Sequence, residues 1–193
     1  MSPTPPASAA PAAPPHRAQV HKIVFVGPVG AGKTQAIRSL SDIEVVSTEA
    51  AASDEVRQIK PRTTVAMDYG VMNLDTGDRV RLYGTPGQDR FDFMWDILTK
   101  GGIGLVLLLD NTRPTPFEDM RFYIKAFKEF IDGTRLVIGV TQMDARRTPT
   151  IDEYVRQLSE LDVSAPIFEV DARQRTDVST LIEALLLQID PTL

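Results

Sequence analysis

The sequence contains no cysteine and has no long uninterrupted run of apolar residues. Without thiols there is no disulfide framework, thiolate metal site or cysteine nucleophile, and no acceptor for prenyl or palmitoyl groups. The longest apolar run, Ile103 to Leu109, contains a glycine and is much shorter than the roughly 20 residues of a membrane helix. We therefore expect a soluble protein in a reducing, cytoplasmic compartment.

An excess of positive charge is also lacking. The chain has 26 acidic and 21 basic residues, which gives a net charge of -5. Such a chain presents no basic field that would attract a polyanion. We therefore expect neither nucleic acid nor an anionic membrane to be its main partner.

Large apolar side chains are nearly missing from the N-terminal stretch MSPTPPASAAPAAPPHR, which contains six prolines. The stretch has no apolar core of a signal peptide, and Ser2 replaces the glycine that myristoylation requires. It cannot build a packed core, so we expect a disordered or polyproline-like arm over residues 1–19. Such an arm is either a plain solubilising tail or a docking segment.

Residues 20–193 are expected to form one folded domain, because the length of the chain suits a single domain with a tail. Short apolar runs at 22–27, 104–110 and 135–141 alternate with segments of helical period, the pattern of a mostly parallel sheet with helices on both faces. Residues 65–69 and 80–84 flank a turn and predict an antiparallel hairpin. The expected fold class is α/β, with about six strands, one of them an antiparallel edge strand.

Capping motifs and apolar period place three helices. A capping box at Thr115–Glu118, with proline at the first helical position, begins one helix, and a second box joins Thr150 to Glu153. A third helix covers residues 178–189, where apolar residues repeat at helical spacing. The apolar residues expected to face inward in the first two are Tyr123, Phe127, Phe130, Ile131, Ile151, Val155 and Leu158.

The stretch GPVGAGKT, Gly27–Thr34, matches the phosphate-binding pattern G-x-x-x-x-G-K-[ST] at every fixed position, between a buried strand and a helix start. The glycines let backbone N–H groups turn inward around phosphates, Lys33 reaches the outer phosphate oxygens, and the Thr34 hydroxyl is placed to bind Mg²⁺. The sequence therefore predicts a nucleotide site here.

From residue 21 to residue 189 the chain resembles small Ras-like GTPases. It is most similar to the bacterial branch related to MglA and to predicted GTPases encoded beside Roadblock-type proteins. This resemblance implies a P-loop G domain that binds GTP or GDP with Mg²⁺, and a Roadblock-type regulator or another effector as partner. The partner surface would be Phe91 to Leu98, where apolar residues lie on two sides of a helix.

Two stretches resemble the base-recognition loops of these proteins. TQMD, Thr141–Asp144, stands where N-K-x-D is usual. The Asp144 carboxylate can accept hydrogen bonds from guanine N1–H and its exocyclic amino group, whereas adenine has no such donors at that edge. VDAR, Val170–Arg173, resembles a degenerate S-A-K segment in which the Ala172 N–H would meet guanine O6. The departures at Thr141 and Gln142 are expected to lower affinity more than specificity.

The first switch is expected within residues 45–64, and the resemblance implies that Thr64 binds Mg²⁺ and the terminal phosphate in the GTP state. Thr63 is the alternative. Arg62 lies next to both threonines, where a positive charge could neutralise the transition state of phosphoryl transfer.

The second switch is expected in RLYGTPGQDRF, residues 81–91. The resemblance implies that Gly87 senses the terminal phosphate and Gln88 positions the attacking water. Gly84 stands where these proteins usually have an aspartate behind the metal, and Val29 occupies a position that is often glycine. We therefore expect slow hydrolysis, with Mg²⁺ held mainly by Thr34, Thr64 and the nucleotide.

The hypothesis is a guanine-nucleotide switch with slow GTPase activity. One alternative is a pseudo-GTPase scaffold without turnover, which Gly84 and Val29 favour, and another is a P-loop ATPase or kinase. The predicted catalytic residues are Gln88, Lys33, Thr64 and Arg62, and the predicted metal ligands are Thr34 and Thr64. The predicted nucleotide-binding residues are Gly27, Val29, Gly30, Ala31, Gly32, Lys33, Thr34, Gln35, Gly87, Thr141, Gln142, Asp144, Asp171, Ala172 and Arg173.

Overall fold

The computed structural model describes residues 18–47, 67–86 and 95–189. Its strands are β1 (Val20–Val26), β2 (Val46–Ser47), β3 (Asp68–Asn73), β4 (Arg79–Gly84), β5 (Gly104–Asp110), β6 (Leu136–Thr141) and β7 (Ile167–Glu169). Its helices are α1 (Lys33–Leu40), α2 (Trp95–Thr99), α3 (Pro116–Ala126), α4 (Lys128–Gly133), α5 (Ile151–Ser159) and α6 (Arg175–Ile189). Most of the predicted arm, the switch residues Arg62, Thr63 and Thr64, and Gly87 and Gln88 lie outside the described residues.

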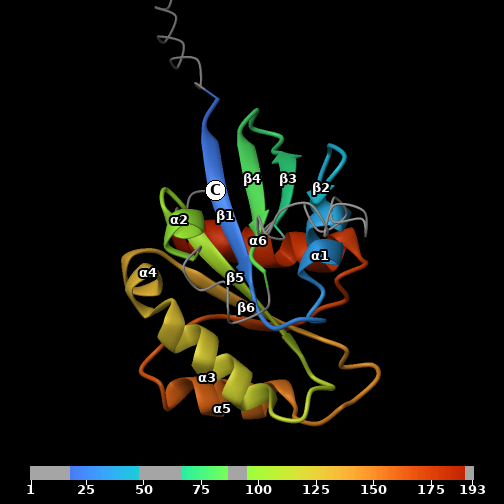
Figure 1. Cartoon of the computed structure of the whole chain (residues 1–193), viewed down its shortest axis with the longest axis vertical. Coiled ribbons are helices and arrows are strands. Elements are labelled where there is room, and N and C mark those ends of the chain that lie inside the picture. The colour runs from blue at the N-terminus through green and yellow to red at the C-terminus, as the bar shows by residue number, and fades with distance from the viewer. Residues whose placement is uncertain (1–17, 48–66, 87–94, 190–193) are drawn as a thin grey trace, which may run out of the picture.

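The strands form one seven-stranded sheet in the order β2-β3-β4-β1-β5-β6-β7, with helices on both sides (Figure 1). The pairs β4-β1, β1-β5, β5-β6 and β6-β7 are parallel, whereas β2-β3 and β3-β4 are antiparallel. The predicted α/β class and the hairpin are confirmed. The short strand β2 is the addition to the expected six, and it lies outside the antiparallel strand β3.

The core has two halves, one on each face of the sheet. On one face α1 and α6 pack against β1, β4 and β5, and on the other α3, α4 and α5 pack against β1, β5 and β6. All of the residues from Leu105 to Leu109 have no exposed surface. A strand covered on both faces is continuously apolar, which is why the sequence run over 104–110 predicted β5 without error in its bounds.

The helix starts follow the predictions in part. At α5 the Glu153 carboxylate accepts a hydrogen bond of 2.7 Å from the Thr150 N–H, so this capping box forms. At α3 the Thr115 side chain makes no capping hydrogen bond, although proline does occupy the first turn. The box predicted at Thr115–Glu118 is therefore wrong, and Pro116 alone begins the helix.

Two predicted apolar faces also need correction. In α5 Leu158 is buried as expected, but the other buried residue is Tyr154, with no exposed surface, whereas Val155 is 50% exposed. The helix predicted through Phe127 is broken there, since α3 ends at Ala126 and α4 begins at Lys128. Phe127 and Ile131 are still buried as expected, because the two short helices lie against the same face of the sheet.

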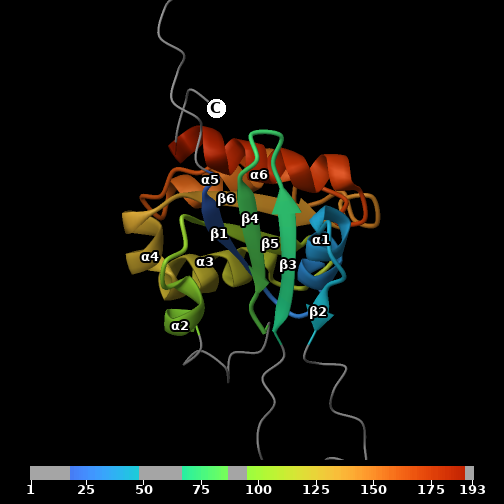
Figure 2. The same cartoon turned by 90° about the horizontal axis from the view of Figure 1, so that it is seen from above.

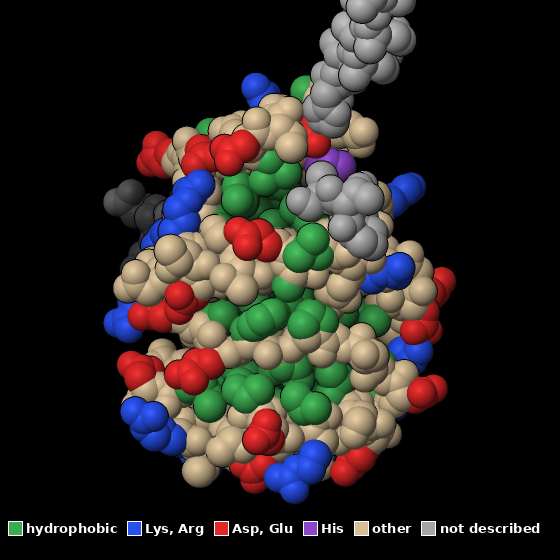
Figure 3. Space-filling view, turned by 180° about the vertical axis from the view of Figure 1, so that it is seen from behind, with side chains coloured by type: hydrophobic (Ala, Val, Ile, Leu, Met, Phe, Trp, Pro, Cys, Tyr) green, Lys and Arg blue, Asp and Glu red, His purple; other side chains and the backbone are tan. Residues whose placement is uncertain are grey.

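Charges are mixed on the side of the molecule away from the viewer of Figure 1. Figure 3 shows that Lys and Arg side chains are interspersed with Asp and Glu there, and that hydrophobic atoms lie between them. A mixed surface of this kind sets up no strong field of one sign. Within the part of the chain that the structure describes, no helix has both the length and the apolar character to cross a bilayer.

Candidate nucleotide-binding site

The loops that carry the sequence motifs follow the carboxyl ends of the parallel strands. Gly27–Gly32 follows β1, Asn111 follows β5, and Gln142–Asp144 and Val170–Arg173 follow β6 and β7. The chain passes from β1 to one side of the sheet, through α1 to β3 and β4, before it returns to β5 on the other side (Figure 2). Ligand sites in open α/β sheets lie at such a reversal of strand order.

The phosphate loop has the backbone that its glycines were expected to allow. Gly27, Gly30 and Gly32 have positive φ angles of 138°, 88° and 92°, which side chains rarely tolerate. At Gly27 a Cβ atom would lie 2.0 Å from the Leu108 carbonyl oxygen, because the end of β1 passes close to β5. The first glycine of the motif is therefore required by packing as well as by the turn.

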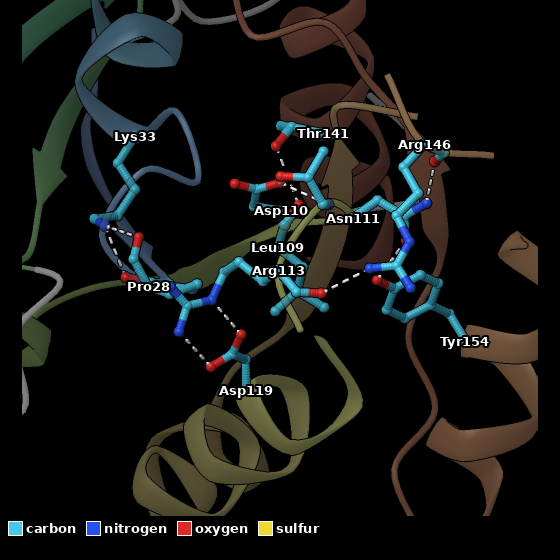
Figure 4. Close-up of polar contacts among 12 residues, drawn as sticks. Pro28, Lys33, Leu109, Asp110, Asn111, Arg113, Asp119, Thr141, Arg146 and Tyr154 are labelled. Atoms are coloured by element: carbon cyan, nitrogen blue, oxygen red, sulfur yellow. Dashed lines mark hydrogen bonds and ion pairs between the residues drawn. The ribbon is translucent and has the colours of Figure 1, made fainter. Parts of the chain in front are cut away.

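Lys33 closes this loop from inside. Its ammonium group donates hydrogen bonds of 2.7 and 2.8 Å to the carbonyl oxygens of Gly27 and Pro28 (Figure 4). The side chain is only 8% exposed, and a buried ammonium group needs such acceptors. Lys33 thus lies inside the turn with its charge pointed into it, and its contact with phosphate oxygens stays a prediction.

Thr34 contacts a residue that is not among the predicted site residues. The Thr34 hydroxyl donates a hydrogen bond of 2.5 Å to a carboxylate oxygen of Asp68, the first residue of β3. Asp68 is 9% exposed, and its Cα is paired across the hairpin with that of Gly84. Gly84 lacks the carboxylate that is usual at this position, but the carboxylate of Asp68 lies beside it on the neighbouring strand.

Gly84 also lacks room for a larger residue. A Cβ atom there would lie 2.9 Å from Ile37 Cδ1 and 3.3 Å from a carboxylate oxygen of Asp68. Both distances are shorter than ordinary van der Waals contacts, and a second carboxylate would face the first. Glycine at residue 84 and aspartate at residue 68 therefore fit each other as a pair.

A Thr34 hydroxyl and a carboxylate are oxygen donors of the kind that Mg²⁺ prefers. Mg²⁺ is usually bound by one or two carboxylates together with nucleotide phosphates and water. Within residues 18–47, 67–86 and 95–189 no group of three or more His, Cys, Asp or Glu is placed to hold a metal alone. These residues fit a metal that arrives with a nucleotide, and they do not form a separate metal cage.

On the other side of the phosphate loop, Thr141 stands where the resemblance led us to expect asparagine. It is 4% exposed. Its hydroxyl lies 3.3 Å from the carbonyl oxygen of Ala31 and 3.1 Å from that of Leu109. The residue thus connects β6 to the phosphate loop and to β5.

A buried polar network holds the loop that follows Thr141 (Figure 4). The Asn111 amide donates to the carbonyl oxygens of Arg146 and Pro149, at 2.5 and 3.0 Å, and Asn111 Oδ1 accepts a bond of 2.9 Å from the Tyr154 hydroxyl. Burial is the main cause that raises the pKa of Tyr154 well above its usual range, so the hydroxyl remains a donor. Sequence reasoning missed this support, because residues 111 and 154 meet only in the fold.

The last loop of the site contacts the phosphate loop directly. Ala172 is buried, and a Cβ atom on Gly32 would lie 3.0 Å from the Ala172 Cβ. Asp171 and Arg173 form an ion pair of 2.8 Å. Hydrogen bonding to the Arg173 side chain is the first cause that lowers the pKa of the Asp171 carboxyl. This pair holds the loop on both sides of Ala172.

The two ends of the site are continuous. A hollow of about 300 Å³ lies over Lys33, Thr34 and Asp68, and Val29, which is 57% exposed, is at its edge. A second hollow of about 380 Å³ is lined by Thr141, Asp144, Ala172 and Arg173, among others. Gly30, Gly32 and Gln35 line both hollows. The phosphate loop is therefore the shared wall of a single elongated cleft.

The structure brings together all of the predicted nucleotide-binding residues that it describes. In or beside the cleft are Gly27, Val29, Gly30, Ala31, Gly32, Lys33, Thr34, Gln35, Thr141, Gln142, Asp144, Asp171, Ala172 and Arg173. Arg62, Thr64, Gly87 and Gln88 stay predictions. Asp68 was missed, although the hairpin offered a signal: pairing of Asn73 with Arg79 puts Asp68 opposite Gly84.

Comparison with known proteins gives two findings. Residues 25–189 match the model of a family described as conserved hypothetical ATP binding protein. The chain is also 25% identical to the Ras-related protein RabC of Dictyostelium discoideum over 182 residues, which cover 90% of this chain and 86% of that protein. It is 24% identical to the Ras-related protein Rab-13 of Canis lupus familiaris over 174 residues, 87% of this chain and 79% of that protein.

These relatives agree with the resemblance to Ras-like GTPases and do not extend to its MglA-like and Roadblock-associated branch. The family match begins inside β1 and ends with α6, so it includes every loop of the cleft. The chain belongs to the family of conserved hypothetical ATP binding proteins and is a distant homologue of Ras-like small GTPases.

Proposed function

We propose that the protein is a guanine-nucleotide switch that binds GTP or GDP with Mg²⁺ and hydrolyses GTP slowly. The observation that carries this proposal is the single cleft in which Lys33 and Thr34 lie at one end and Asp144 and Ala172 at the other. A nucleoside phosphate would match these two ends, because it has a flat base at one end and anionic phosphate oxygens at the other.

Guanine is favoured over adenine although the family description names ATP. Asp144 lines the base end of the cleft, and a carboxylate there requires hydrogen-bond donors on the base. Guanine has two such donors on one edge, whereas adenine would leave the carboxylate unpaired, at a cost of about 1–3 kcal/mol or more. Homology to Ras-related proteins supports the same choice.

At the phosphate end, bound Mg²⁺ would neutralise the phosphate oxygens. Thr34 would bind the metal, the proposed role of Asp68 is to support that metal site with either nucleotide, and the proposed role of Thr64 is to complete the oxygen shell in the GTP state. The hydrogen bond from Thr34 to Asp68 supports this arrangement, since a hydroxyl that donates its proton to a carboxylate keeps its lone pairs for a cation. Asp68 would do the work of the carboxylate missing at residue 84.

For hydrolysis, Lys33 would hold the phosphates, Gln88 would orient the attacking water, and Gly87 would contact the terminal phosphate. Arg62 is the proposed source of an additional charge. Val29 supports a slow rate, since its exposed side chain lies at the phosphate hollow and takes space beside the reacting groups. Positioning and charge neutralisation supply most of the catalysis of phosphoryl transfer.

The proposed effector surface covers residues 91–98, and a Roadblock-type regulator is the proposed partner in the cytoplasm. The described part of this surface supports two distinct sides. Trp95 and Leu98 are buried, whereas Ile97 is 68% exposed. One side of α2 thus packs on the domain, and the other presents an apolar side chain to solvent.

The test of nucleotide choice is competition against a fluorescent GDP analogue. We expect displacement by GDP and GTP and none by ADP or ATP at matched concentration. Asp144→Asn should lose GDP affinity on the order of 100-fold and gain affinity for xanthosine diphosphate, because the new amide can donate to the C2 carbonyl of xanthine. Equal displacement by ADP in the wild type would show that the guanine assignment is wrong.

Turnover is tested separately, by phosphate release from GTP with Mg²⁺ for the wild type and Gln88→Ala. A slow wild-type rate that the substitution abolishes supports the enzyme. Equal background rates in both proteins, with GDP binding intact, would instead establish the scaffold without turnover.

A further inference from the structure

A groove outside the nucleotide cleft is larger than either of its hollows. It has a volume of about 1150 Å³ and lies between α2, the end of α3 and α4, which are neighbours on one side of the sheet (Figures 1 and 2). It is lined by Trp95, Asp96, Thr99, Phe122, Ala126, Phe127, Glu129, Phe130, Gly133 and Thr134. Four of these ten residues are aromatic, so the groove is suited to an apolar ligand.

The aromatic rings are fixed by contacts with one another. The ring centre of Trp95 lies 4.8 Å from that of Phe127, and that of Phe122 lies 6.0 Å from Trp95 in an edge-on arrangement. Trp95 is 6% exposed and Phe122 is 42% exposed. The groove thus has a rigid floor and an aromatic wall that reaches solvent, and such grooves bind extended proline-rich peptides.

The edge of the groove is acidic. Asp96 and Glu129 line it and are exposed. Lys128, the described basic side chain on α4, forms an ion pair of 2.5 Å with Asp132 and not with either of these two carboxylates. A partner with a proline-rich segment and a positive charge next to it would match both features.

The chain itself contains that combination. Residues 3–15 include two P-x-x-P sequences, Pro3–Pro6 and Pro11–Pro14, and the next two residues are His16 and Arg17. Arg17 is the only residue of opposite sign to the groove within the first 17, apart from the titratable His16. A polyproline II helix is largely formed before it binds, so its ordering costs little.

The arm also joins the domain near the groove. The Lys22 ammonium donates a bond of 2.9 Å to the Lys100 carbonyl oxygen, and the Ile103 N–H donates one of 2.8 Å to the Lys22 carbonyl oxygen. Next to this contact, a Cβ atom on Gly102 would lie 3.0 Å from Phe130 Cζ. Thr99 and Phe130 both line the groove. The first strand thus passes one end of the groove at its third residue, Lys22.

The proline-rich arm is long enough to reach the groove. Seventeen residues in a polyproline II helix span about 50 Å, several times the spacing of about 8–10 Å between packed helices. We propose that the proline-rich arm, residues 3–17, binds in the groove between α2, α3 and α4 of its own domain. Proline rings pack on Trp95, Phe122 and Phe130, and Arg17 contacts the acidic edge.

The experiment uses the full chain and its lack of cysteine. Ser8→Cys introduces a unique thiol in the arm, to which a nitroxide spin label is attached, and amide signals are recorded by NMR in the oxidised and reduced states. We expect amides at the groove, such as those of Thr99, Gly133 and Thr134, to lose intensity near the radical. The amide of Val155, on α5, should keep its intensity.

Two matched variants separate docking from mere proximity. Replacement of all six arm prolines by alanine keeps the length and charge of the arm and should restore the groove signals. Phe122→Ala should restore them too, whereas Val155→Ala, at a residue of similar exposure, should leave them broadened. Unchanged broadening in the proline-free arm, or equal broadening around Val155, would overturn the proposal.

A mixed sample identifies the molecule to which the arm binds. Spin-labelled protein without ¹⁵N is combined with unlabelled ¹⁵N protein, so that broadening arises only between molecules. We expect little. Loss of groove signals as large as in the single-species sample would show that the arm binds a second copy, and the intramolecular proposal would be wrong. None of these NMR measurements needs a nucleotide, so a result that contradicts docking leaves the proposed switch function untouched.

Discussion

The two ends of the cleft depart from the Ras-like pattern in different ways. At the base end, Thr141 replaces the expected asparagine in its own position and keeps the contact with the phosphate loop at Ala31. At the metal end, Gly84 loses the expected carboxylate, and Asp68 on the neighbouring strand contacts Thr34. At the base end, a different residue at the same position provides the hydrogen-bond donor. At the metal end, the carboxylate comes from the neighbouring strand of the hairpin.

The difference follows from what each position contacts. The Thr141 hydroxyl meets backbone carbonyl oxygens, which accept a hydrogen bond from any donor of suitable length. Residue 84 lies against Ile37 and β3, and its space is already filled. A carboxylate can therefore reach Thr34 from one of the two paired strands, but the packing does not accommodate both.

The largest expected effect tests the transferred carboxylate. Asp68→Ala should lower the affinity for Mg²⁺ in the GDP complex by about 10–100-fold, as is typical when a group that supports a metal ligand is removed. The measurement is a Mg²⁺ titration of the dissociation rate of a fluorescent GDP analogue. Dissociation in excess chelator should be the same for both proteins, because Asp68 does not line the base end.

A swap sharpens the same comparison. Asp68→Gly together with Gly84→Asp returns the carboxylate to the position usual in Ras-like proteins, and only the tip of Ile37 then has to move. The double variant should recover much of the Mg²⁺ affinity that Asp68→Gly alone loses. No recovery, with both variants folded, would mean that the carboxylate must come from β3.

A smaller effect is expected at the base end. Thr141→Val keeps the shape of the side chain and removes the hydroxyl, which leaves the Ala31 carbonyl oxygen without this donor. A net loss of about 1 kcal/mol corresponds to a roughly fivefold weaker affinity for GDP, measurable by calorimetry. Thr180→Val, which removes a helix-surface hydroxyl bonded to Thr176, is the control and should bind GDP as the wild type does.

The smallest effect concerns the loop around Ala172. Because Arg173 lowers the pKa of Asp171 below its ordinary 3.8, the ionised carboxylate stabilises the folded state. The stabilisation is present above that ordinary value and is lost as the pH falls through the lowered pKa. Asp171→Asn should therefore melt slightly below the wild type at pH 7, and the difference in Tm should shrink as the pH falls below 3.8. A difference independent of pH would contradict the role of this ion pair.

Features set by local sequence were predicted well. The apolar runs located β1, β5 and β6, since a strand buried on both faces needs apolar residues at every position. The spacing of Gly27, Gly32, Lys33 and Thr34 predicted the phosphate loop, because the turn itself imposes those residue types.

Features set by tertiary contacts were not predicted. Asp68 gains its role from the register of a hairpin, and Asn111 supports the base loop through contacts 35 and 38 residues away in the chain. In α5 the apolar period favoured Val155, but Tyr154 is buried instead, with its hydroxyl bonded to Asn111. A linear pattern contains neither the pairing partner of a strand nor the shape of the space that a helix covers.

The position of Asp68 has a mechanical consequence. In the usual Ras-like arrangement the carboxylate behind the metal belongs to the strand that leads into the second switch. Here it belongs to β3, which leaves the predicted first switch, four residues after Thr64. If Mg²⁺ is bound as proposed, Thr64 and Asp68 both contact its shell, so binding of the metal acts at two points on the same segment of chain, and no carboxylate of the strand that leads into the second switch takes part.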